Sequence, residues 1–338
     1  MTDGPDAPHD ETSQDRSHER RPGEKGSAFH AQMRAARTGL EHQVEKARAD
    51  LEHANERINA RTGRNLFVAI LIALGVGGVA VASLLIWDWI FLIFVAALAI
   101  LGVFEFSRAL KVANYRVDVW PQAAAGAVII VSAYFFGHFT HWVISAAAVA
   151  FVIVWRLIAQ MVARDARRYD AVFADAVVSG FIPLYVPFLG SLAIVLLRED
   201  GGNLWVLAMA VIVVASDTGA YATGLAFGRH PMAPRISPKK TWEGFAGAAL
   251  SAMLAGVLLS LFLLNLPFWA GFILGIALLL SATLGDLAES LIKRDLGIKD
   301  MSSWLPGHGG VLDRLDSMLP STAVVLGLFY ALHPLAVS

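Results

Sequence analysis

Three aspartates near the C-terminal end of the chain have the type and spacing to bind a divalent cation. Asp313 and Asp316 are three residues apart, so both carboxylates would lie on one face of a helix, and Asp286 lies near the end of the preceding apolar segment. Carboxylate oxygens are ligands that Mg²⁺ prefers, and phosphate oxygens commonly complete its coordination. The pattern predicts one or two cations acting on a phosphate at a membrane surface.

A basic pair and a glycine-rich turn lie between these aspartates. Lys293 and Arg294 carry positive charge suited to a phosphate, and Gly309 and Gly310 let the backbone approach a ligand closely. His308, in the same turn, is a candidate general acid or base. A plain hydrogen-bonding role is the alternative for this histidine.

A further acidic residue, Asp217, lies deep inside an apolar segment. Ionisable side chains at that depth cost several kcal/mol unless they are paired, metal-bound or hydrated, so they are candidates for function. The structural alternative is a buried aspartate that a neighbouring hydroxyl group satisfies. Because of the cost of that position, we favour a functional role for Asp217.

A basic loop from Ser237 to Thr241 separates two other apolar segments. Pro238 stiffens this loop, and Lys239 and Lys240 come directly before the expected start of a helix. The free N–H groups and positive dipole of a helix N-terminus attract anions, so lysines at this place suit a triphosphate. Ordinary enrichment of basic residues in cytoplasmic loops, or contact with lipid headgroups, is the alternative.

The elements that must position these groups are membrane-spanning helices. Of 338 residues, 56% are hydrophobic and only 16% are charged, whereas about 25% of an average soluble domain is charged. We therefore predict an all-α polytopic membrane protein with about nine spans, each near the ~20 residues that a bilayer core requires. The predicted spans are 66–86, 87–105, 121–138, 141–162, 172–197, 204–228, 241–264, 268–293 and 311–332.

The loops between these spans alternate in basic charge. The set that carries the candidate motifs is rich in Lys and Arg, whereas the opposite set has one Arg and no Lys. By the positive-inside rule, we expect a multi-pass protein of the inner (plasma) membrane, with the N-terminus and the active site cytoplasmic and the C-terminus on the opposite side. Glycines and prolines interrupt the fifth span, which predicts a kink or two half-segments; they are Gly180, Pro183, Pro187 and Gly190.

The N-terminal part of the chain differs in composition from the spans. Residues 1–27 are polar and charged, so we expect a disordered tail without a signal peptide. Apolar residues at spacings of three and four predict an amphipathic, coiled-coil-like cytoplasmic helix over 28–64, which favours a homodimer or, as the alternative, a helix lying on lipid. We then divide the chain into an N-terminal transmembrane region, 65–203, and a C-terminal catalytic region, 204–338. The absence of cysteine excludes disulfides, Cys-ligated zinc and thiol catalysis.

The run from Ser290 to Asp316 resembles the signature of the phosphatidate cytidylyltransferase family, also called CDP-diacylglycerol synthases. Ser216-Asp217-Thr218 and the loop from Ser237 to Thr241 also look like family features, and the resemblance covers 204–332 well. It implies transfer of CMP from CTP to phosphatidate for phospholipid synthesis, giving CDP-diacylglycerol and pyrophosphate. The matching fixed positions are Ser290, Lys293, Arg294, Lys299, Asp300, Pro306, His308, Gly309, Gly310, Asp313, Arg314 and Asp316.

The resemblance also implies a metal site. Asp286, Asp313 and Asp316 would bind Mg²⁺ in a site for two nearby ions that clamp the attacking and leaving oxygens. The identity of the second ion stays open. Asp217 would be a fourth carboxylate of this site or would support the ligands without binding the metal itself. The lipid phosphate, already anionic near neutral pH, would attack the α-phosphorus in line, so a strong general base is not essential.

The basic residues would then hold the two substrates. Lys239 and Lys240 would bind the phosphates of CTP or the departing pyrophosphate, while Lys293 and Arg294 would hold the phosphatidate phosphate, and these two roles are interchangeable. The remaining contacts expected with the substrate phosphates are Ser237, Thr241, Ser290, Lys299, Gly309, Gly310 and Arg314. We expect no nucleic-acid partner.

Two other classes of membrane protein are alternatives. A proton- or cation-coupled transporter would use Asp217 and Asp286 and the broken fifth span, but the sequence shows no inverted repeat and this function leaves the lysines unexplained. A lipid kinase that uses CTP is a second alternative, against which the complete signature argues. The Asp-Gly-Ala-Arg pattern of the CDP-alcohol phosphotransferases is not found in the sequence.

Overall fold

The computed structural model describes residues 66–163, 167–298, 301–302 and 310–336, with side chains from Gly75 onward. The expected tail over 1–27, the amphipathic helix over 28–64 and the homodimer it favours lie outside these residues. So do three of the predicted site residues, which are Lys299, His308 and Gly309. The described residues from Phe67 onward belong to one compact unit.

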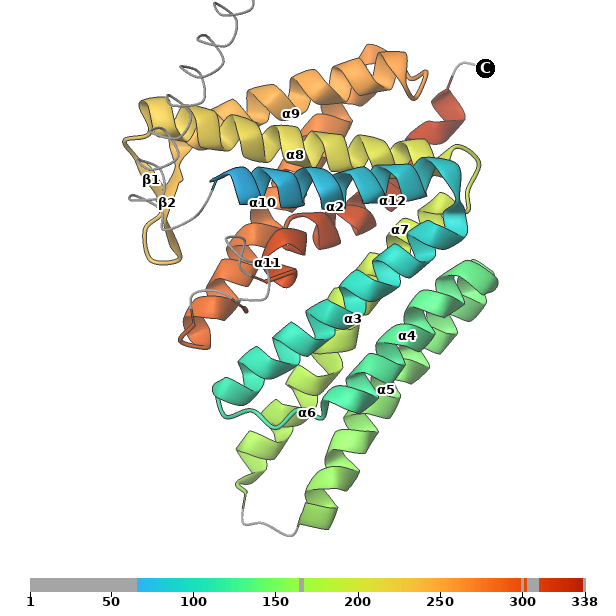
Figure 1. Ribbon diagram of the computed structural model, residues 1–338, viewed down its shortest axis with the longest axis vertical. Helices are drawn as coiled ribbons and strands as arrows, with labels where there is room; N and C mark the ends of the chain where they lie inside the picture. The colour runs from blue at the N-terminus through green and yellow to red at the C-terminus, as the bar shows by residue number, and fades with distance from the viewer. Residues whose placement is uncertain (1–65, 164–166, 299–300, 303–309, 337–338) are drawn as a thin grey trace, which may run out of the picture. The chain divides into compact units, whose positions relative to one another are not determined.

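Helices make up most of this unit, as the sequence predicts (Figure 1). The first half runs as one series of helices up to the middle of the chain. Their bounds are α2 Leu66–Ile86, α3 Asp88–Val112, α4 Val119–Phe135, α5 His138–Ala163, α6 Tyr169–Pro183, the π-helix η1 Leu184–Phe188 and α7 Leu189–Leu197.

The second half contains the remaining helices and one small antiparallel hairpin, which lies at one end of α8 and α9 (Figure 1). The bounds are α8 Gly202–Phe227, β1 Pro231–Ala233, β2 Ser237–Thr241, α9 Trp242–Phe262, α10 Phe268–Asp295, α11 Leu312–Leu315, α12 Met318–Leu332 and the 3₁₀ helix η2 His333–Leu335.

Among the residues described, seven helical segments are long and apolar enough to cross a membrane. α4 and the part of α2 with described side chains, Gly75–Ile86, are shorter apolar helices. A polytopic membrane protein is thus confirmed, whereas the number of nine spans stays a prediction. The second segment runs to Val112 rather than ending at residue 105. The helix continues beyond its apolar part through Arg108 and Lys111.

The fifth predicted span is one continuous segment, Tyr169–Leu197, with a π-helical turn at its centre. Pro187 has no N–H to give to the helical ladder, and the π-helical turn includes this position. The ring of Pro187 also approaches α4 closely, since a Cβ on Gly126 would lie 2.9 Å from Pro187 Cγ. The segment is therefore continuous through the π-helical turn rather than divided into two half-segments.

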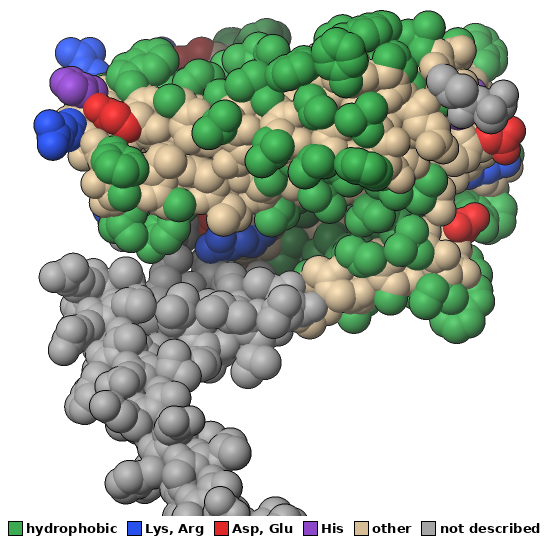
Figure 2. Space-filling model, turned by 90° about the horizontal axis from the view of Figure 1, so that it is seen from above, with side chains coloured by type: hydrophobic (Ala, Val, Ile, Leu, Met, Phe, Trp, Pro, Cys, Tyr) green, Lys and Arg blue, Asp and Glu red, His purple; other side chains and the backbone are tan. Residues whose placement is uncertain are grey.

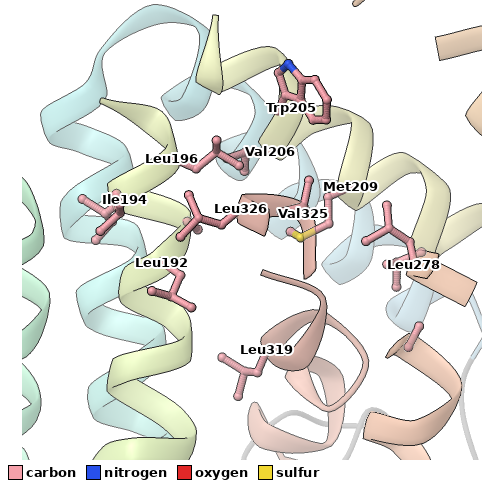
Figure 3. Packing of buried hydrophobic residues seen from close by; sticks show 14 of the residues in the cluster. Leu192, Ile194, Leu196, Trp205, Val206, Met209, Leu278, Leu319, Val325 and Leu326 are labelled. Carbon is pink, nitrogen blue, oxygen red and sulfur yellow. The ribbon is translucent and has the colours of Figure 1, made fainter. Parts of the chain in front are cut away.

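This continuous segment forms the centre of the hydrophobic core. In its most apolar part 72% of the residues are buried, the largest share among the seven candidate spans. Figure 3 shows side chains of α7, α8, α10 and α12 packed together in this core. They include Leu192, Leu196, Trp205, Met209, Leu278, Val325 and Leu326. The contact of α7 with α8 and α12 joins the two halves of the chain.

The outer faces of the helices are apolar, as contact with lipid requires. Along α9, Leu250, Leu254, Leu258 and Phe262 recur at four-residue intervals and all are exposed. Figure 2 shows hydrophobic side chains over most of the visible face and charged side chains near its edges. This distribution fits helices that cross a bilayer.

Candidate active site

A polar pocket opens where the C-terminal helices meet the hairpin. Residues from α8, β1, β2, α9, α10 and the α11–α12 region line it. It brings together groups that are separated by up to a hundred residues in the sequence. The charged residues that line this pocket are Asp217, Lys239, Lys240, Asp286, Asp313, Arg314 and Asp316.

Three carboxylates in the pocket lie close enough to repel one another. Asp217 comes from α8, Asp286 from α10 and Asp316 from the junction of α11 and α12. Each of the three pairs interacts electrostatically. The Ser317 N–H donates to Asp316 Oδ1 over 2.7 Å, which fixes one oxygen of that carboxylate.

The hairpin places a lysine directly against this acidic group. Lys240 Nζ lies 2.5 Å from Asp286 Oδ2, and both side chains are partly buried. The Ser290 hydroxyl donates to the other oxygen of Asp286 over 3.3 Å. Lys239 also lines the pocket and is more exposed than its neighbour. An anion bound here would meet two lysines on one strand.

The loop predicted between the sixth and seventh spans is this hairpin. Pro231 pairs with Thr241 and Ala233 with Ser237, and an irregularity lies between the two pairs. Strands this short are difficult to predict from the sequence. Pro238 in the second strand also argues against a strand, because proline cannot donate a hydrogen bond to a neighbouring strand. The hairpin contains four of the expected phosphate contacts, which are Ser237, Lys239, Lys240 and Thr241.

Two contacts fasten the base of the hairpin to α9. The Thr241 side chain caps this helix, because its hydroxyl accepts a hydrogen bond from the Gly244 N–H over 3.1 Å. Glu243 Oε1 lies 2.6 Å from His230 Nδ1, while Oε2 accepts from the backbone N–H groups of Arg229 and His230. The structure thus assigns Thr241 a helix-capping contact at the edge of the pocket.

Asp313 also lines the pocket, but the fold already binds both of its oxygens. Oδ1 accepts from Lys293 Nζ over 2.9 Å, and Oδ2 accepts from the backbone N–H of Gly310 over 2.8 Å and of Met301 over 3.1 Å. Lys293 Nζ also lies 3.3 Å from Oε1 of Glu289, a fully buried residue. This lysine thereby links α10 to the turn that begins α11.

The other predicted basic residues lie in different surroundings. Arg314 lines the pocket and is exposed there. Arg294 is exposed and directs its Nε to the Ile236 carbonyl oxygen, 3.3 Å away in the hairpin. Thus the hairpin lysines and Arg314 lie at the pocket, whereas Lys293 and Arg294 make contacts that hold the surrounding elements together.

The chemistry of these donors fits a hard cation. Oxygen-only sets of carboxylates suit Mg²⁺, and a cation would relieve the repulsion among Asp217, Asp286 and Asp316. Within the described ranges, no three acidic or histidine side chains are placed to hold a metal ion as they stand. Lys240 is paired with Asp286, so a cation would have to compete with this lysine for the carboxylate.

The sequence analysis missed one residue that contacts this region, Glu105 of α3. It lies in the run Phe104-Glu105-Phe106 near the end of the second predicted span, and only 3% of it is exposed. Its carboxylate accepts hydrogen bonds from the backbone at the start of α11. Asp217 was identified because an ionisable group among apolar residues is costly. The same argument applies to Glu105 and could have identified it.

Comparisons with known proteins match this chain to one family. The model of the cytidylyltransferase family matches residues 67–332. The chain is 38% identical over 280 residues to a phosphatidate cytidylyltransferase of Mycobacterium bovis, covering 81% of this chain and 91% of that protein. A protein of the same name from Mycobacterium leprae is 38% identical over 283 residues, or 78% and 87% of the two chains. One from Haemophilus influenzae is 43% identical over 122 residues, or 35% and 42%.

Proposed function

This chain belongs to the cytidylyltransferase family, and we propose that it transfers CMP from CTP to phosphatidate, forming CDP-diacylglycerol and pyrophosphate. The observation that carries the proposal is a pocket in which basic side chains of a hairpin face three carboxylates from separate elements. A nucleotidyltransferase that joins two polyanions needs both kinds of group. The transporter alternative is set aside, because the family is one of enzymes.

The reaction requires the pocket to bring two anionic phosphates together. An oxygen of the phosphatidate phosphate attacks the α-phosphorus of CTP, the bond from that phosphorus to the bridging oxygen breaks, and pyrophosphate leaves. Positioning and charge neutralisation are the main contributions to catalysis of this kind. Lys239, Lys240 and Arg314 are the pocket cations that we assign to the phosphates of CTP and the leaving pyrophosphate.

The acidic residues would hold a divalent cation for this step. We assign Asp217, Asp286 and Asp316 to it, because these carboxylates share the pocket and repel one another. A bound Mg²⁺ supplies positive charge to the phosphoryl oxygens. Ligation by Asp313 stays a prediction, since Lys293 and two backbone N–H groups already bind its carboxylate. A second cation is likewise a prediction.

The orientation in the membrane is part of the proposal. The pocket is lined by the C-terminal halves of α8 and α10, by the start of α9 and by the hairpin that carries Lys239 and Lys240. The positive-inside rule then directs the pocket and the N-terminus to the cytoplasm and the C-terminus across the inner (plasma) membrane. CTP, a cytoplasmic metabolite, and a lipid headgroup would meet there.

The proposed reaction is tested with CTP that carries a label on either of two phosphates, by following which product receives each label. Purified protein is incubated with phosphatidate in mixed micelles and with CTP labelled at the α- or the γ-phosphate. We expect the α-label in a lipid product, CDP-diacylglycerol, and the γ-label in pyrophosphate. Transfer of the γ-label to lipid would instead identify a kinase that uses CTP, and no transfer of either label would refute both functions.

Turnover is expected to depend on a divalent cation. Removal of metal with EDTA should abolish formation of CDP-diacylglycerol, since Asp217, Asp286 and Asp316 would then repel one another and the substrate phosphates. Addition of Mg²⁺ in excess over the chelator should restore it. The measurement is the initial rate as a function of free Mg²⁺, and a rate that is independent of the chelator would contradict the metal assignment.

A further inference from the structure

We propose that Glu105 is a positioning residue for the reaction, holding the segments on both sides of residues 303–309 so that Arg314 and Asp316 face the pocket. This inference rests on the proposed function for what the pocket does. Glu105 belongs to α3, in the N-terminal half of the chain. It lies 197 to 207 positions before the residues that it contacts. It is buried and lies outside the lining of the pocket.

Both oxygens of the Glu105 carboxylate accept hydrogen bonds. The Val311 N–H donates to Oε1 and the Leu312 N–H donates to Oε2, each over 2.9 Å. The Ser302 hydroxyl also donates to Oε1, at 2.5 Å. Ser302 precedes residues 303–309 and Val311 follows them closely, so one side chain binds the chain on both sides of that segment.

An acidic side chain is the appropriate partner for these three groups. An ionised carboxylate accepts hydrogen bonds through both oxygens and donates none, whereas the amide of glutamine has one accepting oxygen and an NH₂ group. Leu312 and Val311 are buried, so their N–H groups would pay a desolvation cost of about 1–3 kcal/mol each without a partner. The carboxylate of Glu105 removes this cost.

The backbone at Gly310 lies so close to the Glu105 carboxylate that a side chain at position 310 would collide with it. A Cβ on Gly310 would lie 2.6 Å from Oε2 of Glu105, nearer than real Cβ contacts occur. A side chain at position 310 would therefore displace the Glu105 carboxylate. The Gly310 N–H donates in turn to Asp313, so two carboxylates, those of Glu105 and Asp313, bind the same turn.

The position of this turn determines where the catalytic groups lie. α11 begins at Leu312, and the Arg314 N–H donates to the Val311 carbonyl oxygen over 3.0 Å. Arg314 and Asp316 follow within the same turn and line the pocket. A shift of Val311 and Leu312 would therefore move both side chains relative to the substrate phosphates.

The test compares Glu105→Gln with Asp175→Asn as a matched control. Asp175 is also a fully buried carboxylate that accepts from a backbone N–H, that of Arg116, and pairs with Arg167, but it lies in α6. Glu105→Gln should lower kcat about 100-fold, because small misplacements of reacting groups cost about that much, with KM for both substrates changed less than about threefold. Asp175→Asn should lower the unfolding temperature while kcat stays within about threefold of wild type.

Hydrogen exchange supplies a readout that does not need the reaction. Glu105→Gln should speed exchange in the peptide that contains Val311 and Leu312, and Asp175→Asn should leave that peptide unchanged. Wild-type protein without CMP transfer would refute the proposed function but leave this exchange result to decide on Glu105. Unchanged kcat together with unchanged exchange in Glu105→Gln would overturn the inference.

A second pair of variants covers the case in which Glu105→Gln does not fold. Gly310→Ala should lower kcat, because the added methyl group meets the Glu105 carboxylate. Glu105→Asp shortens that side chain, so the double variant should recover at least about fivefold in kcat over Gly310→Ala. Equal activities of the single and double variants would mean that Glu105 does not set the position of the turn.

Discussion

Asp316→Asn is expected to lower kcat for CDP-diacylglycerol formation about 1,000-fold, because it removes one of three carboxylates assigned to the cation on which charge neutralisation depends. The fold should survive the change. Asparagine keeps an oxygen that can accept the Ser317 N–H, and the substitution removes repulsion from Asp217 and Asp286. The rate is measured with purified protein at saturating CTP, phosphatidate and Mg²⁺.

A thermal-unfolding measurement separates loss of the metal site from loss of structure. Mg²⁺ should raise the unfolding temperature of the wild type, because a ligand that binds only the folded state stabilises it by mass action, and this shift should be absent in Asp316→Asn. Asp118→Asn is the control, since Asp118 is half-exposed and pairs with Arg156 away from the pocket. A variant with normal turnover and a normal Mg²⁺ shift would remove Asp316 from the metal site.

Lys240→Ala is expected to lower kcat/KM for CTP about 100-fold, which corresponds to about 2.7 kcal/mol of transition-state stabilisation. Lys240 Nζ lies at the acidic group, 2.5 Å from Asp286, where the phosphates of CTP would be bound next to the cation. Loss of the Lys240 side chain removes positive charge from the pocket and leaves Asp286 without this ion-pair partner. Initial rates over a range of CTP concentrations give the effect.

Two comparisons make this second prediction specific. Arg235→Ala changes an exposed basic residue in the turn of the same hairpin, and it should leave kcat/KM within about twofold of wild type. If Lys240→Ala raised KM for phosphatidate instead of KM for CTP, Lys240 would hold the lipid phosphate. If Lys240→Ala matched Arg235→Ala, the ion pair with Asp286 would be the role of this lysine, without a contribution to substrate binding.

The positions of the helices could be predicted well from the sequence. Hydropathy over about twenty residues is a local property, and the predicted limits of 66–86 and 268–293 compare with Leu66–Ile86 and Phe268–Asp295 in the structure. The hairpin at Ser237–Thr241 was not predicted, because three to five residues of strand with a proline give no clear alternation. The π-turn at Pro187 was predicted only as an interruption.

The candidate site could be predicted in part. The cost of charge among apolar residues identified Asp217 and Asp286 without reference to their partners, and the pocket contains both together with Asp316. The same argument did not assign partners. Lys293, which is expected to hold the lipid phosphate, lies between Glu289 and Asp313, and that phosphate role stays a prediction, while Lys240 pairs with Asp286.

The sequence by itself determined which segments are helices, which residues carry unusual charge and which family motif they form, because each of these depends on nearby residues. Only the tertiary structure decided which charges meet. The carboxylate of Glu105 reaches Val311, 206 positions later, through the packing of α3 against the start of α11. Such contacts depend on how helices cross, and crossing geometry is set by side-chain packing over the whole chain rather than by local spacing.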